Sequence, residues 1–161
     1  MRLLVLLLVA GLAILALRGY LESDRRQIER QFERLAEAAS VQGTESPIEQ
    51  IAQAAQVVRF FTNDVVLRLG QDSSSVIAGR DALVALAAQA RRRGPLQVMF
   101  DDVQVSVGGP DSASVYATVT ATGANLQSEV VEAREISVTL QKVDGDWLIA
   151  RVEGVRTLER P

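Results

Sequence analysis

The sequence predicts an α+β fold in which a long antiparallel sheet follows a compact helical unit and curls around it. Three segments between residues 23 and 93 repeat apolar residues at helical spacing, and residues 96–157 alternate between apolar and polar residues as strands do. A chain of 161 residues is long enough for one domain with a sizeable core. An apolar run at the N-terminus adds a membrane or export segment ahead of that domain.

The N-terminal run covers residues 3–17 and is apolar without interruption between Arg2 and Arg18. It is short for a bilayer-spanning helix of about 20 residues, although residues 19–21 extend it. No small-x-small cleavage motif follows it at the right place. We therefore interpret residues 1–21 as a transmembrane anchor or uncleaved signal. A cleaved signal, which would make the protein secreted or periplasmic, is the alternative.

The sequence carries two opposing signals for membrane orientation, that is, for the side of the membrane on which the domain of residues 22–161 lies. Arg18, Arg25 and Arg26 follow the apolar run, and their charge alone favours a cytoplasmic domain. N-terminal apolar segments of this length usually act as export signals, however, and acidic neighbours dilute the charge. We expect a single-pass protein of the inner membrane with its domain on the periplasmic side.

The composition excludes several classes of function. The chain has no cysteine and no histidine, which removes disulfides, thiolate metal sites, the commonest general base and the commonest transition-metal ligand. We therefore expect no bound metal and no cofactor. With a net charge of −3 and no domain-wide basic patch, we expect no nucleic-acid partner either.

The first helix of the domain is predicted at about residues 23–40, where arginine and glutamate fill one face and the other face is apolar. The apolar face is formed by Ile28, Phe32, Leu35, Ala36 and Ala39. The simpler interpretation is that this face covers the sheet. The alternative is a juxtamembrane coiled coil that makes the protein a homodimer.

The second helix begins at a capping box over residues 46–49, with serine as the N-cap, proline at the first helical position and glutamate at the third. An apolar stripe predicts that this helix continues to about Phe61. The stripe consists of Ile48, Ile51, Ala52, Ala55 and Val58. A short strand is predicted at residues 65–69 and a polar turn at residues 70–75.

The third helix is predicted over Arg80–Arg92, and Gly94-Pro95 ends it. Its predicted inward-facing residues are Leu83, Leu86, Ala87 and Ala90. The basic run Arg91–Arg93 is expected to cap the C-terminal end of this helix, where cations are favoured. Contact with anionic lipid head groups is the alternative.

Four strands are predicted in the rest of the chain, over residues 96–107, 113–122, 130–142 and 147–157. In the first of them the apolar phase flips at Asp101-Asp102, which predicts a bulge. Residues 123–127 are predicted to turn the chain. The last two strands are predicted to form a hairpin around Asp144-Gly145.

The order and residues of these segments resemble a known family. The similarity is carried by residues 60–69 (FFTNDVVLRL), 76–83 (VIAGRDAL) and 144–155 (DGDWLIARVEGV), and it covers about Ser46–Arg156. The chain resembles the nuclear transport factor 2-like superfamily, which includes SnoaL-like proteins and ketosteroid isomerases. The resemblance implies a cone: a strongly curved, mixed sheet packed around three helices, with a pocket opening at one end.

The resemblance also raises the chemistry of ketosteroid isomerases, which needs a carboxylate base and an oxyanion hole made by a tyrosine and a protonated acid. Asp64 is at a position that the family often occupies with aspartate, and Tyr116 is the only tyrosine inside the domain. The simpler interpretation of Asp64 is a turn residue that satisfies backbone donors. No acid can be placed beside Tyr116 from the sequence.

Charged residues are also predicted on an otherwise apolar face of the last hairpin. A turn at residues 144–145 pairs Leu140 with Ile149, Val138 with Arg151, and Ile136 with Glu153. Arg134 joins the same face. Such charges are costly unless they are paired or functional. The simpler interpretation is a structural Arg–Glu pair at the rim of the sheet; the functional one is a polar patch that lines the cone and binds a carboxylate.

We therefore predict a membrane-anchored, non-catalytic cone domain that binds a partner protein or a small apolar ligand. The candidate pocket-lining residues are Asp64, Tyr116, Arg134, Arg151 and Glu153. The alternative is a small isomerase, cyclase or hydratase that uses Asp64 or the patch of Arg151 and Glu153. Fold alone does not decide between these functions.

Overall fold

The computed structural model describes residues 2–43, 45–68, 76–125 and 128–155, with side chains at residue 19 and from residue 21 onward except 124–132. The described elements are α1 (Arg2–Ala39), α2 (Pro47–Val58), β1 (Phe61–Arg68), β2 (Val76–Ala78), α3 (Arg80–Arg91), β3 (Leu96–Val107), β4 (Ser112–Asn125), β5 (Ser128–Val143) and β6 (Asp146–Gly154). The strands form one sheet in the order β2-β1-β6-β5-β4-β3.

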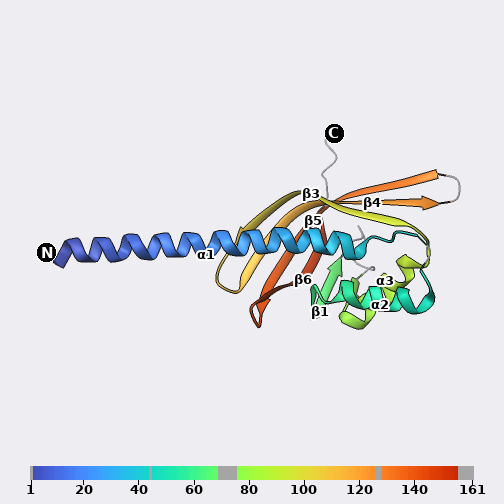
Figure 1. Ribbon diagram of the computed structural model, residues 1–161, viewed down its shortest axis with the longest axis horizontal. Coiled ribbons are helices and arrows are strands. Elements are labelled where there is room, and N and C mark those ends of the chain that lie inside the picture. Colours follow the sequence, from blue (N-terminus) through green and yellow to red (C-terminus); the bar gives the residue numbers. More distant parts are fainter. Residues whose placement is uncertain (1, 44, 69–75, 126–127, 156–161) are drawn as a thin grey trace.

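The sheet is mixed and strongly curved. Strand β1 runs parallel to β6, whereas every other neighbouring pair is antiparallel. Helix α1 lies along the concave side of the sheet, and α2 and α3 lie together at one end (Figure 1). The predicted α+β fold with a curved mixed sheet around three helices is therefore confirmed for the described residues.

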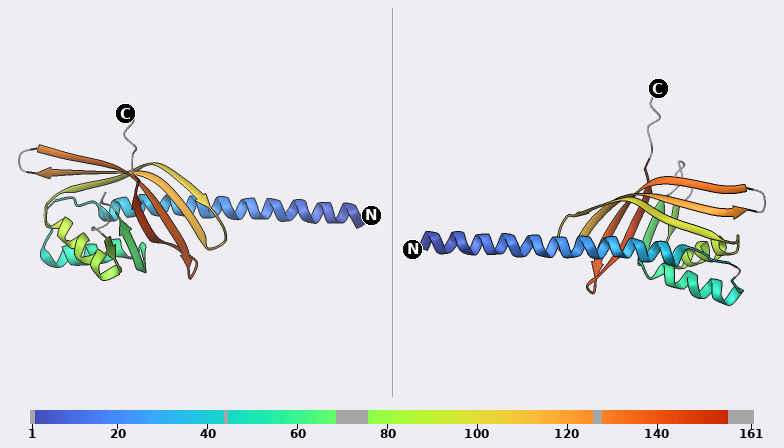
Figure 2. Two further views of the ribbon diagram at one scale, coloured as in Figure 1. Left: turned by 180° about the vertical axis from the view of Figure 1, so that it is seen from behind. Right: turned by 45° about the horizontal axis from the view of Figure 1, so that its top comes forward.

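Helix α1 is one continuous helix of 38 residues that ends at Ala39, so the helix predicted at about residues 23–40 forms its C-terminal part. The N-terminal half of α1 extends beyond the sheet, as two further views also show (Figure 2). Within the part of the chain whose side chains are described, no helix is long and apolar enough to span a membrane. The run at residues 3–17, on which the predicted anchor rests, has its side chains outside that part.

Helix α2 has the predicted capping box. The Ser46 hydroxyl accepts from the Glu49 N–H, and the Glu49 carboxylate accepts from the Ser46 N–H at 2.7 Å. That backbone hydrogen bond, followed by the one with the Ser46 side chain, lowers the pKa of Glu49. The helix ends at Val58, three residues before the predicted end at Phe61, because Arg59 and Phe60 donate to carbonyls three residues back and tighten the last turn.

The buried face of α2 is not the apolar stripe of the sequence. The buried residues are Ala54, Val57 and Val58, so four of the five stripe residues are exposed. The short connection from Val58 to β1 explains this, since it turns the face that carries Val57 and Val58 toward the core. On α3, Leu86 is also exposed, which contradicts its predicted inward position.

Strand β3 has the predicted bounds, β1, β4 and β5 are longer than predicted, and β6 ends at Gly154 rather than at residue 157. Two backbone irregularities were predicted. The register between β3 and β4 shifts after Asp101, and Asp102 has φ +52°, which confirms the bulge. Asp144 and Gly145 both have positive φ, +52° and +91°, as a tight two-residue hairpin requires. Strand β2 was not predicted, β1 starts at Phe61 rather than at residue 65, and the predicted turn at 70–75 lies outside the described residues.

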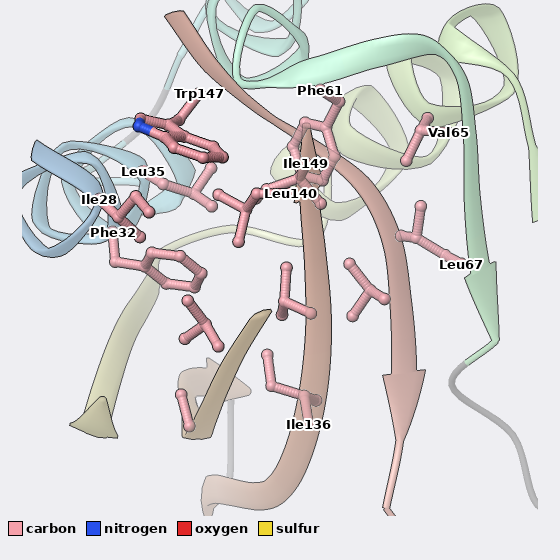
Figure 3. Close-up of a cluster of buried hydrophobic side chains, with 14 of the residues drawn as sticks. Ile28, Phe32, Leu35, Phe61, Val65, Leu67, Ile136, Leu140, Trp147 and Ile149 are labelled. Carbon is pink, nitrogen blue, oxygen red and sulfur yellow. The ribbon is translucent and has the colours of Figure 1, made fainter. Parts of the chain in front are cut away.

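The core lies between α1 and the concave face of the sheet (Figure 3). Its largest fully buried side chains are Trp147, Phe32, Ile28, Leu140, Ile149, Val65, Val115 and Val138. Phe32 also meets Phe100 of β3 edge to face, with ring centroids 5.2 Å apart. Aromatic and aliphatic side chains therefore fill the described interior of the cone.

Candidate functional site

The register of the last hairpin decides where its charged residues point. Leu140 pairs with Ile149 as predicted, but beyond this pair the register shifts, and Thr139 lies opposite Arg151. Ala150 is the extra residue in β6, a bulge that the sequence pattern did not reveal. The predicted pairings of Val138 with Arg151 and of Ile136 with Glu153 are therefore wrong.

Because of this bulge, the residues of β6 that follow Ala150 point to the opposite face of the sheet from the one predicted. Val138 and Val152, which pair across the hairpin, are both buried, so the concave face keeps its apolar residues. Arg151 and Glu153 consequently project from the other, outer face of the sheet, because neighbouring residues of a strand point to opposite faces. They do not line the concave interior.

The outer face brings together four residues that we call the outer-face patch: Arg68, Tyr116, Arg151 and Glu153. The register runs from Tyr116 on β4 through Ser137 on β5 to Glu153 on β6 and Arg68 on β1. The Glu153 Oε1 lies 3.4 Å from the Arg151 Nη1 and 3.8 Å from the Arg68 Nη1. Two guanidinium groups therefore share one half-exposed carboxylate, and Tyr116, which is 44% exposed, lies two strands away on the same face.

Arg134 is separated from this patch. It shares the strand face of Ile136, one side-chain period further along β5, and lies opposite Val119 of β4. Its side chain is exposed, because β4 and β5 continue past the packed core. Of the predicted candidates, Arg134 therefore lies on the concave face, as the alternation along β5 predicted.

Asp64 and Tyr116 do not come together. Asp64 is exposed on β1, at the irregularity between Phe61 and Val66 in the pairing of β1 with β6. Strands β6 and β5 separate β1 from β4, which carries Tyr116. The described residues therefore contain no assembled set of carboxylate base, tyrosine and protonated acid of the kind that a ketosteroid isomerase needs.

A buried polar cluster, which the sequence analysis missed, joins α1 to the last hairpin. The Asp24 Oδ1 accepts from the Lys142 Nζ at 2.8 Å and from the Trp147 Nε1 at 3.2 Å. Asp24 is only 3% exposed, and the Lys142 Nζ also lies 5.2 Å from the centroid of the Trp147 ring. Gln31, two turns further along α1, donates to the Trp147 carbonyl.

A signal for this cluster was present in the sequence. Asp24 precedes Ile28 by four residues and so continues the apolar face of the helix toward its N-terminal end. An acid on an otherwise apolar stripe indicates a buried partner, because an unpaired buried carboxylate is costly. The cluster is a structural contact that fixes where α1 leaves the sheet.

A second buried charge joins the helices to one another. Arg91, 4% exposed, donates to the Glu45 Oε1 at 2.6 Å and to the Ala38 carbonyl. It therefore connects the end of α3 to the end of α1, whereas Arg92 and Arg93 are exposed. Only these last two residues of the basic run are accessible to an external partner.

An open groove of about 450 Å³ lies between α1 and α2. Its lining residues are Arg34, Glu37, Ala38, Gln53, Gln56, Arg59 and Phe60. Its lining combines polar and apolar surface, and none of the predicted candidate residues belongs to it.

Comparison with known proteins gives a family and a fold. Residues 23–153 match the family model described as the SnoaL-like domain. No curated protein matches the chain. An NTF2-like protein with a cystatin-like fold from Novosphingobium aromaticivorans is similar in structure, with a TM-score of 0.70 and 17% identity over 91% of this chain and 90% of that chain.

Two further solved structures are similar. One is a protein provisionally assigned as a scytalone dehydratase from Novosphingobium aromaticivorans, with a TM-score of 0.71 and 17% identity over 88% of this chain and 89% of that chain. The other is the association domain of CaMKII from C. elegans, with a TM-score of 0.63 and 13% identity over 84% of this chain and 97% of that chain. At these identities the likeness concerns the fold.

Proposed function

Because this chain belongs to the SnoaL-like domain family, we propose that it is a non-catalytic member, held at a membrane by the N-terminal part of α1, that binds a partner protein through the outer-face patch. The family includes isomerases and hydratases. The observation that carries the non-catalytic proposal is the filled interior: Phe32, Leu140 and Trp147 are at most 1% exposed and occupy the space between α1 and the sheet (Figure 3).

The chemistry of the outer-face patch supports a protein partner. Tyrosine and arginine are enriched where interfaces gain most of their binding energy. Arg68 and Arg151 share the single carboxylate of Glu153, so the patch carries an excess positive charge that an acidic group of a partner would neutralise. A structural neighbour of the chain is named an association domain, which is consistent with a fold that serves binding.

Membrane attachment is supported by the sequence and by the course of α1. Residues 3–17 are apolar without interruption, and α1 carries them away from the sheet. We expect the full chain to remain in the membrane fraction after alkaline carbonate extraction and a chain without residues 1–18 to be released. Release of the full chain by carbonate would contradict the anchor, and a periplasmic reporter fused to the C-terminus tests the orientation.

The partner proposal is tested by photocrosslinking. A benzophenone amino acid in place of Tyr116 should crosslink one defined protein in intact cells, and Arg151→Glu should abolish that product because it reverses the charge of the patch. Arg93→Glu is the matched control, since Arg93 is an equally exposed arginine far from β6. Absence of a product, or equal loss with both substitutions, would falsify the assignment to this face.

A small isomerase, cyclase or hydratase, or a protein that binds a small apolar ligand, is the runner-up. The similar structure that is assigned as a scytalone dehydratase favours it. Its candidate carboxylates are Asp64 and Glu153, both of which lie away from the filled interior. Turnover of a ketosteroid or of a hydratable phenol that Asp64→Asn or Glu153→Gln abolishes would replace our proposal with this one.

A further inference from the structure

The groove of about 450 Å³ between α1 and α2 is built from segments that other elements hold in place. The Phe60 carbonyl accepts from the Ile149 N–H at 2.9 Å, which attaches the turn after α2 to β6. On the α1 side of the groove, the Ala38 carbonyl accepts from Arg91, the buried arginine of α3. Both sides are therefore fixed before any ligand arrives, and a preformed site binds at a lower entropic cost.

Two arginines line this groove, Arg34 of α1 and Arg59 at the end of α2. Within the part of the chain whose side chains the structure describes, neither guanidinium group forms a hydrogen bond or an ion pair. Arg34 stays unpaired although Glu37 lies one helical turn away, whereas Arg25 and Glu29 of the same helix pair at 3.0 Å. Two unpaired guanidinium groups on one groove can bind an anion between them, because each offers a planar fork of donors.

The course of the two helices brings both arginines to the same end of the groove. Helix α2 folds back along α1, so the two helices run in opposite directions (Figures 1 and 2). In such a pair, an earlier residue of one helix lies beside a later residue of the other. Arg34 is therefore at the end of the groove where Arg59 and Phe60 lie, whereas Ala38 is toward Gln53.

We propose that this groove binds a small monocarboxylate with an apolar body. The ligand carboxylate accepts from Arg34 and Arg59, and the apolar body lies against Phe60 and Ala38. Two guanidinium groups and the single carboxylate of Glu37 leave one positive charge on the lining, which matches a monoanion and disfavours a dianion. The volume of about 450 Å³ also suits a small molecule, because such sites measure roughly 300–1,000 Å³.

The groove is a different site from the outer-face patch and does not rest on the function proposed above. Its lining comes from α1, α2 and the two residues after α2, with no residue of a described strand. Ala38 and Phe60 pack against the core and also line the groove, so each is half-buried. A ligand body placed on them would remove their remaining apolar surface from water. The site therefore stands or falls independently of a protein partner at Arg151.

Nuclear magnetic resonance of the full chain in mild detergent locates the ligand. The probe is phenylacetate, and phenylacetamide is the neutral control of nearly the same shape. We expect phenylacetate to shift the side-chain amide signals of Gln53 and Gln56, which line the groove. The Nε–H signals of Arg34 and Arg59 should shift with them, with a dissociation constant on the order of 1 mM that rises with added salt. Equal shifts with phenylacetamide, or shifts confined to residues outside the groove, overturn the proposal.

Paired substitutions test the two arginines. Arg34→Gln/Arg59→Gln should raise the dissociation constant of phenylacetate at least about tenfold, because it removes both donor forks. Arg30→Gln/Arg93→Gln is the matched control and should change it less than about twofold, since neither arginine lines the groove. All four side chains are exposed, so both variants should keep the circular dichroism spectrum of the natural chain. Equal effects of the two double variants overturn the proposal.

A third variant tests the selection of a monoanion by Glu37. The natural chain should bind phenyl phosphate, a dianion at neutral pH, more weakly than phenylacetate. Glu37→Gln should lower the dissociation constant of phenyl phosphate at least about fivefold, because it removes a like charge beside the anion. An unchanged dissociation constant for phenyl phosphate would overturn the charge matching on which the choice of a monocarboxylate rests.

Discussion

The two faces of the sheet differ in exposure: the concave face is buried and apolar, whereas the outer face is exposed and carries charged residues. On the concave face, Val115, Val138 and Leu140 are at most 1% exposed and pack against α1. On the outer face of the same sheet, Tyr116 and Glu153 are exposed by nearly half. The comparison teaches that a single extra residue, Ala150, is enough to move an arginine and a glutamate from the concave face that packs the core to the outer face of the sheet.

The sharpest difference between the faces is expected at Trp147, which is 1% exposed and contacts α1. Trp147→Ala should lower the free energy of unfolding by about 3–5 kcal/mol, because it removes the largest buried side chain and leaves a cavity. Tyr116→Ala on the outer face is the control and should change it by no more than about 0.5 kcal/mol. Chemical denaturation measures both, and equal losses would contradict a core confined to the concave face.

The next effect concerns the buried polar cluster at the edge of the concave face. Asp24→Ala should lower the free energy of unfolding by about 2–3 kcal/mol, because it removes the buried carboxylate that accepts from the Lys142 ammonium and from the Trp147 N–H. Asp24→Leu/Lys142→Leu should recover most of this loss, since it removes both charges together. A double variant as unstable as Asp24→Ala would show that the charges themselves hold α1 in place. Denaturation of these variants beside the exposed-pair control Glu29→Ala decides the point.

A smaller effect is expected at the bulge that reverses the faces of β3. Asp102 has φ +52°, a backbone conformation that β-branched residues disfavour. Asp102→Val should therefore lower the free energy of unfolding by about 1–2 kcal/mol, whereas Asp102→Gly should be neutral or slightly stabilising. The neighbouring Asp101→Val is the control, because Asp101 keeps an ordinary extended backbone. Thermal unfolding would contradict the bulge if both valine variants behaved alike.

These positions also show how far the sequence could predict the fold. Alternating apolar residues and a capping box are local signals, and they predicted every described element except β2, together with the bulge at Asp102 and the hairpin at residues 144–145. The bulge at Ala150 left no trace in the pattern, since Val152 and Ile149 are both apolar and alanine suits either face. Every candidate beyond that point was therefore assigned to the wrong face.

The exposure of α2 escaped prediction for a different reason. Its periodicity shows that an apolar stripe exists, but it does not show whether the stripe faces the core or the solvent. The contact with the core is decided by the connection to β1, which is tertiary information. Lys142 and Trp147, which hold Asp24, are likewise 118 and 123 residues away in the chain, so no local pattern joins them.

The smallest effect is expected in the outer-face patch, where both arginines lie on the same oxygen of Glu153 and are about half exposed. Arg151→Ala should change the free energy of unfolding by less than about 0.5 kcal/mol, because water screens exposed ion pairs and Arg68 keeps the carboxylate paired. Glu153→Gln should have the larger effect of the two, since it leaves two guanidinium groups side by side. Urea denaturation of Arg151→Ala and of Glu153→Gln at low and high salt tests this order. A loss above about 1 kcal/mol for Arg151→Ala would mean that the patch stabilises the sheet, and the outer face would then no longer have an arginine available for a partner's carboxylate.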